Sequence, residues 1–164
     1  MKQAALPGIL AIALSIVGVP SAVAQTSTFM LVPNIAGDST ELQHVRWIEV
    51  FSITQSFNSA TKANACTVLV AKGLDRSGPL LWAAAATGKI FPEIRIDILK
   101  TTGDNAPRFY ELILTNATIS AITSMPNSFA EQLTLTGASA TLTYFPQNPD
   151  GSIVPPVTST VTCK

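Results

Sequence analysis

The stretch RSGPLLWAAAATGKIFPEI, residues 76–94, decides the fold of this chain, because it is the one helical pattern among segments that are otherwise typical of β-strands. Ser77 or Gly78 can cap a helix that begins at Pro79, and Gly88 can end it. A helix this short is marginal alone in water. It therefore needs a larger structure to lie against.

The apolar character of this segment predicts how it packs. Leu80, Leu81, Trp82 and the four alanines that follow leave almost no polar face. We expect a helix near residues 79–87 that covers the flank or end of a β-structure and buries Trp82. Its alanines would also permit close approach of another backbone, which suits a subunit contact.

Alternating apolar residues predict strands in most of the remaining chain. The expected strands cover residues 27–35, 44–57, 66–74, 93–100, 108–122 and 131–145, with a Pro-interrupted last segment over 152–163. Proline restricts that last segment to an edge or partner-facing strand. Strands at this spacing indicate a sandwich or a small closed barrel. The fold class we expect is mainly β: a small antiparallel β-barrel with one short flanking α-helix.

Two of these strands contain a conflict in alternation. In residues 131–145, Leu133 and Leu135 share one parity, whereas the apolar residues after Gly137 share the other. A strand changes faces only through an extra residue, so Gly137 is expected to be a bulge or a sharp bend.

The strand over residues 44–57 has apolar residues on both parities. Phe51 and Ile53 lie on one parity, and Ile48 and Val50 on the other. If Phe51 and Ile53 point into the barrel, Ile48 and Val50 lie outside it. Exposed apolar pairs commonly mark an interface, so Ile48 and Val50 are the expected subunit contact.

Residues 1–24 have the pattern of a secretory signal peptide. Lys2 gives a positive start, residues 4–19 form an uncharged apolar run, and Ala-Val-Ala ends at Ala24. A membrane anchor is the alternative, but the run is shorter than the roughly 20 residues that span a bilayer. We expect cleavage after Ala24 and a secreted or periplasmic domain over residues 25–164, with no membrane attachment in the mature form.

The two cysteines, Cys66 and Cys163, both follow the leader. An exported chain meets an oxidising compartment, so an even pair favours a disulfide. Closing a loop of this size stabilises by about 4 kcal/mol in the chain-entropy model. Two unpaired thiols are the alternative. Burial in the core could explain a free Cys66, but it does not explain a cysteine at position 163, one residue from the end of the sequence.

Charge excludes several classes of partner. Without Lys2, nine Lys and Arg stand against ten Asp and Glu, a net charge of about −1. The charges are scattered, with no basic patch for nucleic acid and no cluster of cations for an anionic membrane. We therefore expect no nucleic-acid partner.

The sequence does not favour catalysis. His44 is the only histidine, and general acid–base work needs positioned partners. There is no G-x-S-x-G nucleophile elbow and no His/Cys cluster with zinc spacing. Asp97 with Glu111, and Glu93 with Arg95, could face each other across a hairpin, but outward charges on neighbouring strands are typical of a solvated face. We expect no catalytic residue, no cofactor and no metal site.

Four ordered blocks resemble one known family. They are WIEVFSITQSFN (47–58), GLDRSGPLLWAAAATGKIFPEIRIDIL (73–99), YELILTNATISAI (110–122) and EQLTLTGASATLTYFPQNPDGS (131–152). Their order and spacing are similar to the haemolysin-coregulated proteins, which form the tube of type VI secretion. The resemblance covers nearly all of residues 28–155.

The resemblance implies an Hcp-like β-barrel flanked by one helix and no catalytic residues. It further implies six copies in a ring with a central pore, rings stacked into a tube, and secreted effectors or spike and sheath proteins as further partners. A ring-forming secretion-tube protein is thus one hypothesis. An exported monomeric binding module of the same fold is the other. The leader and the cysteine pair favour the module, whereas Ile48, Val50 and the small-residue helix favour self-association.

Overall fold

The computed structural model describes residues 25–57, 66–101, 107–148 and 154–163. The leader expected at residues 1–24 lies outside the described residues. No helix in the described part of the chain is long and apolar enough to cross a membrane.

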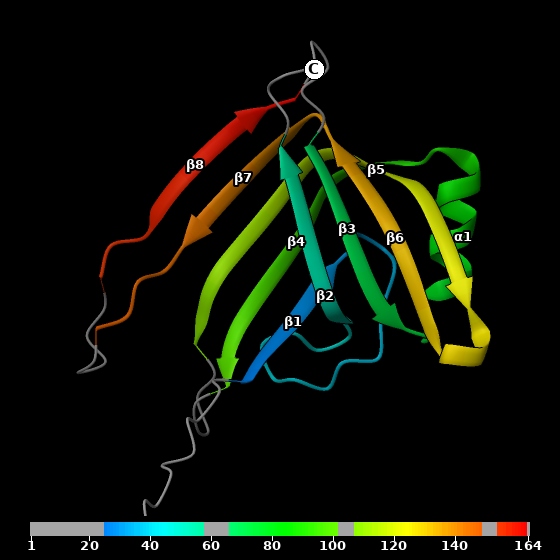
Figure 1. Ribbon diagram of the computed structural model, residues 1–164, viewed down its shortest axis with the longest axis horizontal. Helices are drawn as coiled ribbons and strands as arrows, with labels where there is room; N and C mark the ends of the chain where they lie inside the picture. The colour runs from blue at the N-terminus through cyan, green and yellow to red at the C-terminus, as the bar shows by residue number, and fades with distance from the viewer. Residues whose placement is uncertain (1–24, 58–65, 102–106, 149–153, 164) are drawn as a thin grey trace, which may run out of the picture.

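Eight strands, one α-helix and one short 3₁₀-helix make up the described chain (Figure 1). In chain order they are β1 (Gln25–Leu31), β2 (Ile48–Phe57), β3 (Cys66–Gly73), α1 (Gly78–Thr87), β4 (Ile90–Thr101), β5 (Arg108–Met125), η1 (Pro126–Ser128), β6 (Ala130–Gly137), β7 (Ser139–Tyr144) and β8 (Val157–Thr162). The expected helix and strands are therefore present, with small shifts at their ends.

The strands form one antiparallel sheet that returns on itself. Its order is β4-β1-β2-β3-β6-β5-β7-β8, and β4 also pairs with β5. Strands β1 to β6 thereby close a barrel, while β7 and β8 extend from β5 as a two-stranded unit that we term the arm. This confirms the predicted fold class of a small antiparallel barrel with one flanking helix.

The core consists of buried apolar side chains from the inner faces of the strands and from α1. Its members include Met30, Ile48, Val68, Val70, Leu81, Phe91, Ile94, Ile96, Leu112, Leu114, Leu133 and Leu135. Alternation along β3 and β6, and at Ile94 and Ile96 of β4, places the apolar residues of these strands inside, because successive side chains of a strand point to opposite faces.

The predicted corner at Gly137 is confirmed. β6 ends at Gly137 and β7 begins at Ser139, and both strands pair with the same edge of β5. A Cβ at Gly137 would lie 3.1 Å from the carbonyl oxygen of Ser139 and 3.2 Å from Leu114 Cβ. The extra residue between the strands turns both apolar sets inward, and glycine leaves room for the turn.

The expectation for β2 is wrong. Ile48 and Val50 are only 0% and 7% exposed and belong to the core, whereas Phe51 is 70% exposed. The reason is a β-bulge: the pairing of β2 with β3 shifts register between Val50 and Ser52. The extra residue reverses which parity faces inward. Ile48 and Val50 are thus unavailable to a neighbouring subunit, and Phe51 lies outside.

The expected burial of Trp82 is also wrong, since its side chain is 45% exposed. α1 instead buries Gly78, Leu81 and Ala84, a stripe with helical spacing of three residues. Gly88 ends the helix in the left-handed conformation, with φ 60°, and its backbone N–H bonds to the last turn. A helix without a polar face gives no sequence signal for the side that packs.

Candidate functional site

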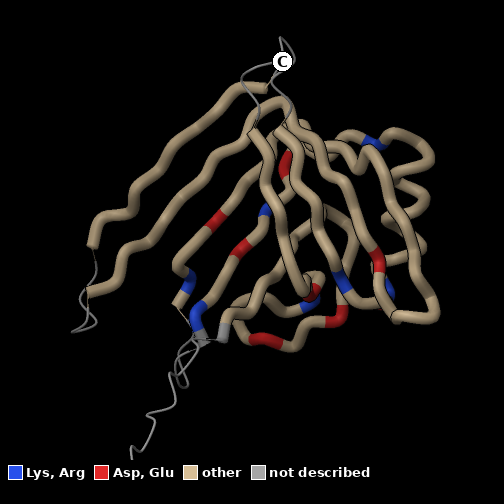
Figure 2. The backbone as a smooth tube through the Cα atoms, in the orientation of Figure 1, with Lys and Arg blue, Asp and Glu red and all other residues tan. Residues whose placement is uncertain are grey.

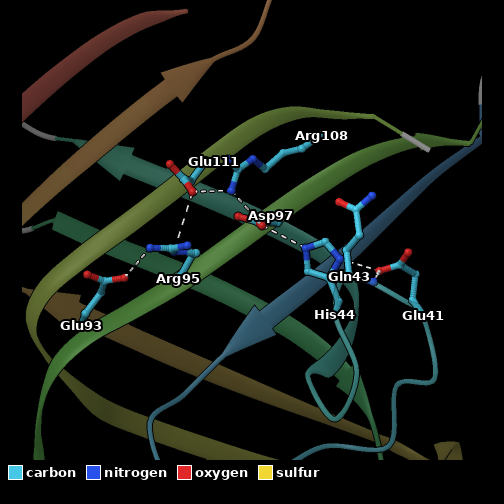
Figure 3. A network of polar contacts seen from close by, with 8 residues as sticks. All are labelled: Glu41, Gln43, His44, Glu93, Arg95, Asp97, Arg108 and Glu111. Atoms are coloured by element: carbon cyan, nitrogen blue, oxygen red, sulfur yellow. Dashed lines mark hydrogen bonds and ion pairs between the residues drawn. The ribbon is translucent and has the colours of Figure 1, made fainter. Parts of the chain in front are cut away.

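His44 lies at the centre of a polar network on the outside of the barrel (Figure 3). Its Nδ1 lies 2.6 Å from Glu41 Oε2, and its Nε2 lies 2.9 Å from Asp97 Oδ2. The ring stacks on Phe29 at 4.8 Å and meets Trp47 edge-on at 4.5 Å. These contacts attach the segment before β2 to β1 and β4.

Of the two predicted pairs, only Asp97 and Glu111 face each other across the hairpin, because Glu93 and Arg95 both lie on β4. Asp97 lies directly opposite Glu111 in the β4–β5 pairing. Arg108 Nη1 bridges the two carboxylates, at 3.2 Å from Asp97 and 2.6 Å from Glu111. Arg95 pairs with Glu93 at 3.1 Å and with Glu111 at 3.7 Å. The sequence did not identify Glu41 or Arg108 as members of this network, nor Gln43, Trp47 and Phe145 as neighbours of it. Arg108 precedes Glu111 by three residues, and a register shift between Ile98 and Leu99 separates them in the β4–β5 pairing.

A cavity of about 360 Å³ adjoins this network. It is lined by Gln43, His44, Trp47, Arg95, Asp97, Arg108 and Phe145. Glycoside hydrolysis needs one carboxylic acid and one free carboxylate beside the substrate, whereas Asp97 and Glu111 both accept bonds from Arg108. The arrangement is that of cross-strand ion pairs that hold the β4–β5 surface together.

The described residues contain no group of three or more His, Cys, Asp or Glu side chains placed to hold a metal ion. Burial raises the pKa of Tyr110, and a hydrogen bond from its hydroxyl group to Gln55 opposes the rise.

Cys66 and Cys163 form a disulfide, as predicted, with their Cα atoms 5.6 Å apart. Cys66 is the first residue of β3, inside the barrel wall, and Cys163 directly follows β8. The backbone N–H of Cys163 also donates to the carbonyl oxygen of Ala138 at 2.8 Å. The bond therefore ties the end of the arm to the barrel.

The arm has two chemically different faces. Thr141 and Thr160 are paired by their hydroxyl groups at 2.9 Å, and Thr143 and Thr158 at 3.2 Å. Residues directly opposite each other in an antiparallel pair share a face. The face of these threonines is therefore polar along both strands.

The other face of the arm is mainly apolar. It carries Ala140, Leu142 and Tyr144 of β7 opposite Val161, Ser159 and Val157 of β8. The same β7 residues lie opposite Leu114, Leu112 and Tyr110 of β5, so this face continues the inner face of the barrel. It is uncovered at the tip of the arm, where Val157 is 64% exposed and Tyr144 is exposed as well, and Val161 is exposed near the other end of β8.

α1 presents a second exposed apolar surface. Leu80 and Trp82 are both exposed, and because they are two residues apart they lie on opposite flanks of the buried stripe that contains Leu81 and Ala84. Figure 1 shows α1 and the arm on different sides of the barrel. Neither α1, β7 nor β8 contains a charged residue, so these parts of the tube in Figure 2 are uniformly uncharged.

Comparison with known proteins identifies the family. Residues 29–144, from β1 to the end of β7, match the family described as "Type VI secretion system effector, Hcp". The chain belongs to this family. The match spans most of the chain and includes the last three residues of β1 and all of β2 to β7.

Individual members of the Hcp family are similar to this chain. Protein hcp1 of Pseudomonas aeruginosa is 25% identical over 139 residues, which cover 76% of this chain and 86% of the relative. A solved type six secretion system protein has a TM-score of 0.71 and 21% identity, covering 84% of this chain and 96% of that one. Hcp1 from Salmonella typhimurium has a TM-score of 0.69 and 19% identity, covering 85% and 95%. These structures show the same fold.

Proposed function

We propose that this protein is a non-enzymatic structural component of type VI secretion that closes into hexameric rings and stacks into a tube. The observation that carries the proposal is the family match over residues 29–144, which covers the closed barrel except for the first part of β1. Other copies of the chain are then the first partners. Secreted effectors and the spike and sheath proteins of the machine are the second.

The export route is part of the proposal. A leader over residues 1–24, cleaved after Ala24, delivers the mature domain of residues 25–164 to the periplasm or beyond. The Cys66–Cys163 bond supports this route, because disulfides persist in oxidising compartments and are rare in the cytosol.

Two measurements on protein purified from the secreted or periplasmic fraction test these statements. Light scattering at micromolar concentrations should give the mass of a hexamer. The intact mass should correspond to a chain that begins at Gln25 and contains one disulfide. A retained leader, or two thiols that alkylate without reductant, would contradict the export route.

The second candidate function is an exported monomeric binding module. The disulfide favours it, because the bond gives the single barrel a stability of its own outside the cell. A mass that stays monomeric at all accessible concentrations would reject the ring and leave the module as the better account.

A further inference from the structure

Two buried polar atoms in the network around His44 have no hydrogen-bond partner among the described residues. They are Arg95 Nε and Asp97 Oδ1. Asp97 is only 3% exposed, and its other oxygen, Oδ2, accepts bonds from His44 and Arg108. Arg95 Nε lies 3.7 Å from Glu111 Oε2, which is too long for a hydrogen bond. Leaving a buried polar atom unpaired is costly, so both atoms need an explanation.

Both residues line the same cavity, the one of about 360 Å³ beside His44. Pockets that bind small molecules measure roughly 300–1,000 Å³, so this cavity has room for one small ring. The last torsion of an aspartate side chain is broad, and a small rotation of the Asp97 carboxylate brings Oδ1 toward a group placed in the cavity. The cavity therefore offers one acceptor and one donor that the protein itself does not use.

The charges of the network disfavour a charged ligand. Figure 3 shows the guanidinium groups of Arg95 and Arg108 among four carboxylates. Each guanidinium already contacts two of these carboxylates, which leaves neither group free to bind an anion. A cation at Asp97 would lie beside Arg108, whose Nη1 is 3.2 Å from the same carboxylate. A neutral ligand avoids both penalties.

Aromatic side chains form part of the cavity wall. Trp47 and Phe145 both line the cavity, and each is partly exposed. The guanidinium of Arg108 lies over the ring of Phe145 at 4.7 Å. An aromatic wall favours a ligand with an apolar C–H surface, whereas an unused donor beside an unused acceptor favours hydroxyl groups, which both donate and accept. A saccharide ring combines the two, because its faces carry C–H groups and its rim carries hydroxyl groups.

We propose that this cavity binds one neutral saccharide ring. One hydroxyl group donates to Asp97 Oδ1, a neighbouring hydroxyl accepts from Arg95 Nε, and the C–H face of the ring packs against Trp47. All of these groups belong to one chain, so the site goes beyond the proposed function and does not depend on ring formation. It joins segments that are far apart in the sequence and exists only in the folded barrel.

Three sugars with the same ring and different charge test the ligand class. Mature protein with its disulfide intact is titrated with glucose, galactose and mannose by calorimetry, and at least one should bind with a dissociation constant of about 1 mM or below. Glucosamine adds a positive charge to the glucose ring, and glucuronate adds a negative one. Each should bind at least about ten-fold more weakly than the best neutral hexose.

Tryptophan fluorescence tests the place of binding. The chain has two tryptophans, so Trp82→Phe leaves Trp47 as the only one. The emission of that variant should shift when the best neutral hexose is added, because the sugar displaces water from the indole ring. Trp47→Phe is the matched variant. It leaves only Trp82, on α1, whose emission should not respond.

Arg95→Lys tests the donor. Lysine keeps the positive charge beside Glu93 and Glu111 but has no Nε–H, so the affinity for the hexose should fall at least about ten-fold. Arg76→Lys is the control, since Arg76 is exposed and pairs with Asp38 outside the cavity, and its affinity should equal that of wild type. Both sites are on the surface, and the unfolding midpoints should stay close to wild type.

Each contrary result overturns a stated part of the inference. No binding of any of the three neutral hexoses at about 50 mM would overturn the saccharide site. Tighter binding of glucosamine or glucuronate would overturn the neutral ligand, a response of Trp82 in place of Trp47 would overturn the location, and an unchanged affinity in Arg95→Lys would overturn the donor. The proposed ring is judged separately by its mass. A hexamer that binds no sugar keeps the proposed function, and a monomer that binds sugar keeps this inference.

Discussion

Lys72 and Glu131 form an ion pair inside the barrel, with Lys72 Nζ 2.7 Å from Glu131 Oε2. They lie directly opposite each other in the β3–β6 pairing, at positions whose parity is otherwise apolar. Both side chains are buried, and Nζ also lies 2.8 Å from Asp75 Oδ1 and donates to the carbonyl oxygen of Gly73. The cation is thus satisfied where no water reaches it, as buried charges require.

This pair also fixes where α1 begins. A Cβ at Gly78 would lie 3.0 Å from Glu131 Oε1 and 3.1 Å from Oε2. Glu131 cannot move away without leaving Lys72. The first turn of α1 therefore lies directly on the ion pair, and glycine permits the close approach.

Lys72→Met should destabilise the protein by about 3–5 kcal/mol, because it leaves the Glu131 carboxylate buried without its partner. The double variant Lys72→Met with Glu131→Leu should recover most of that loss, since no charge then remains buried. Urea unfolding with the disulfide intact measures both. Arg76→Met is the control: its pair with Asp38 is exposed, and the loss should be below about 1 kcal/mol. Equal losses at residues 72 and 76 would contradict the role of burial.

Leu81→Ala should cost about 2–5 kcal/mol, because Leu81 is completely buried between α1 and the barrel. Trp82→Ala should cost clearly less, because the indole side chain of Trp82 is about half exposed in the isolated chain. The comparison is made by urea unfolding at concentrations below association. A larger loss for Trp82 than for Leu81 would mean that α1 packs with its other side inward.

Cys163→Ser should lower the free energy of unfolding by about 2–5 kcal/mol, since it opens a loop that joins residues 97 apart in the sequence. Wild-type protein in reductant should lose a similar amount. The freed Cys66 remains in an apolar site that a thiol tolerates. Unchanged stability in both experiments would show that the bond does not constrain the chain.

Tyr110 should make stability fall at alkaline pH. Burial raises the pKa of its phenol above the usual value. Above about pH 10 the unfolded chain therefore loses this proton more readily than the folded chain, which favours unfolding. Tyr110→Phe should remove this part of the loss between about pH 9 and pH 11 in urea titrations. Tyr144→Phe, at an exposed site, is the control and should leave the alkaline loss in place.

His44→Ala should cost about 1–3 kcal/mol, because it deprives the buried Asp97 carboxylate of one of its partners and removes the stack on Phe29. Gln43→Ala, at the neighbouring exposed position, should stay within about 0.5 kcal/mol. Unfolding free energies measure both. Equal values for the two variants would show that the network adds nothing to the attachment of this segment.

The charged surface of β4 and β5 shows how far local patterns extend. Alternation placed Asp97 and Glu111 opposite each other, and the pairing confirms this. The expectation of a solvated face is wrong for Asp97, which is buried beneath His44. Arg108 was not part of that prediction, because its reach to two carboxylates depends on a register shift between Ile98 and Leu99. Strand register is a relationship between two segments, and one segment's sequence does not contain it.

The sequence by itself determined the strands, the single helix, the corner at Gly137 and the pairing of two cysteines. The first three follow from local patterns, and the cysteine pairing follows from the oxidising compartment that the leader pattern predicts. The tertiary structure decided which side of each element faces the core. A bulge after Val50 places Ile48 inside and Phe51 outside, and an all-apolar helix buries Leu81 in place of Trp82. Apolar residues on both sides of an element make either orientation locally acceptable. Only the packing of that element against the rest of the barrel selects one.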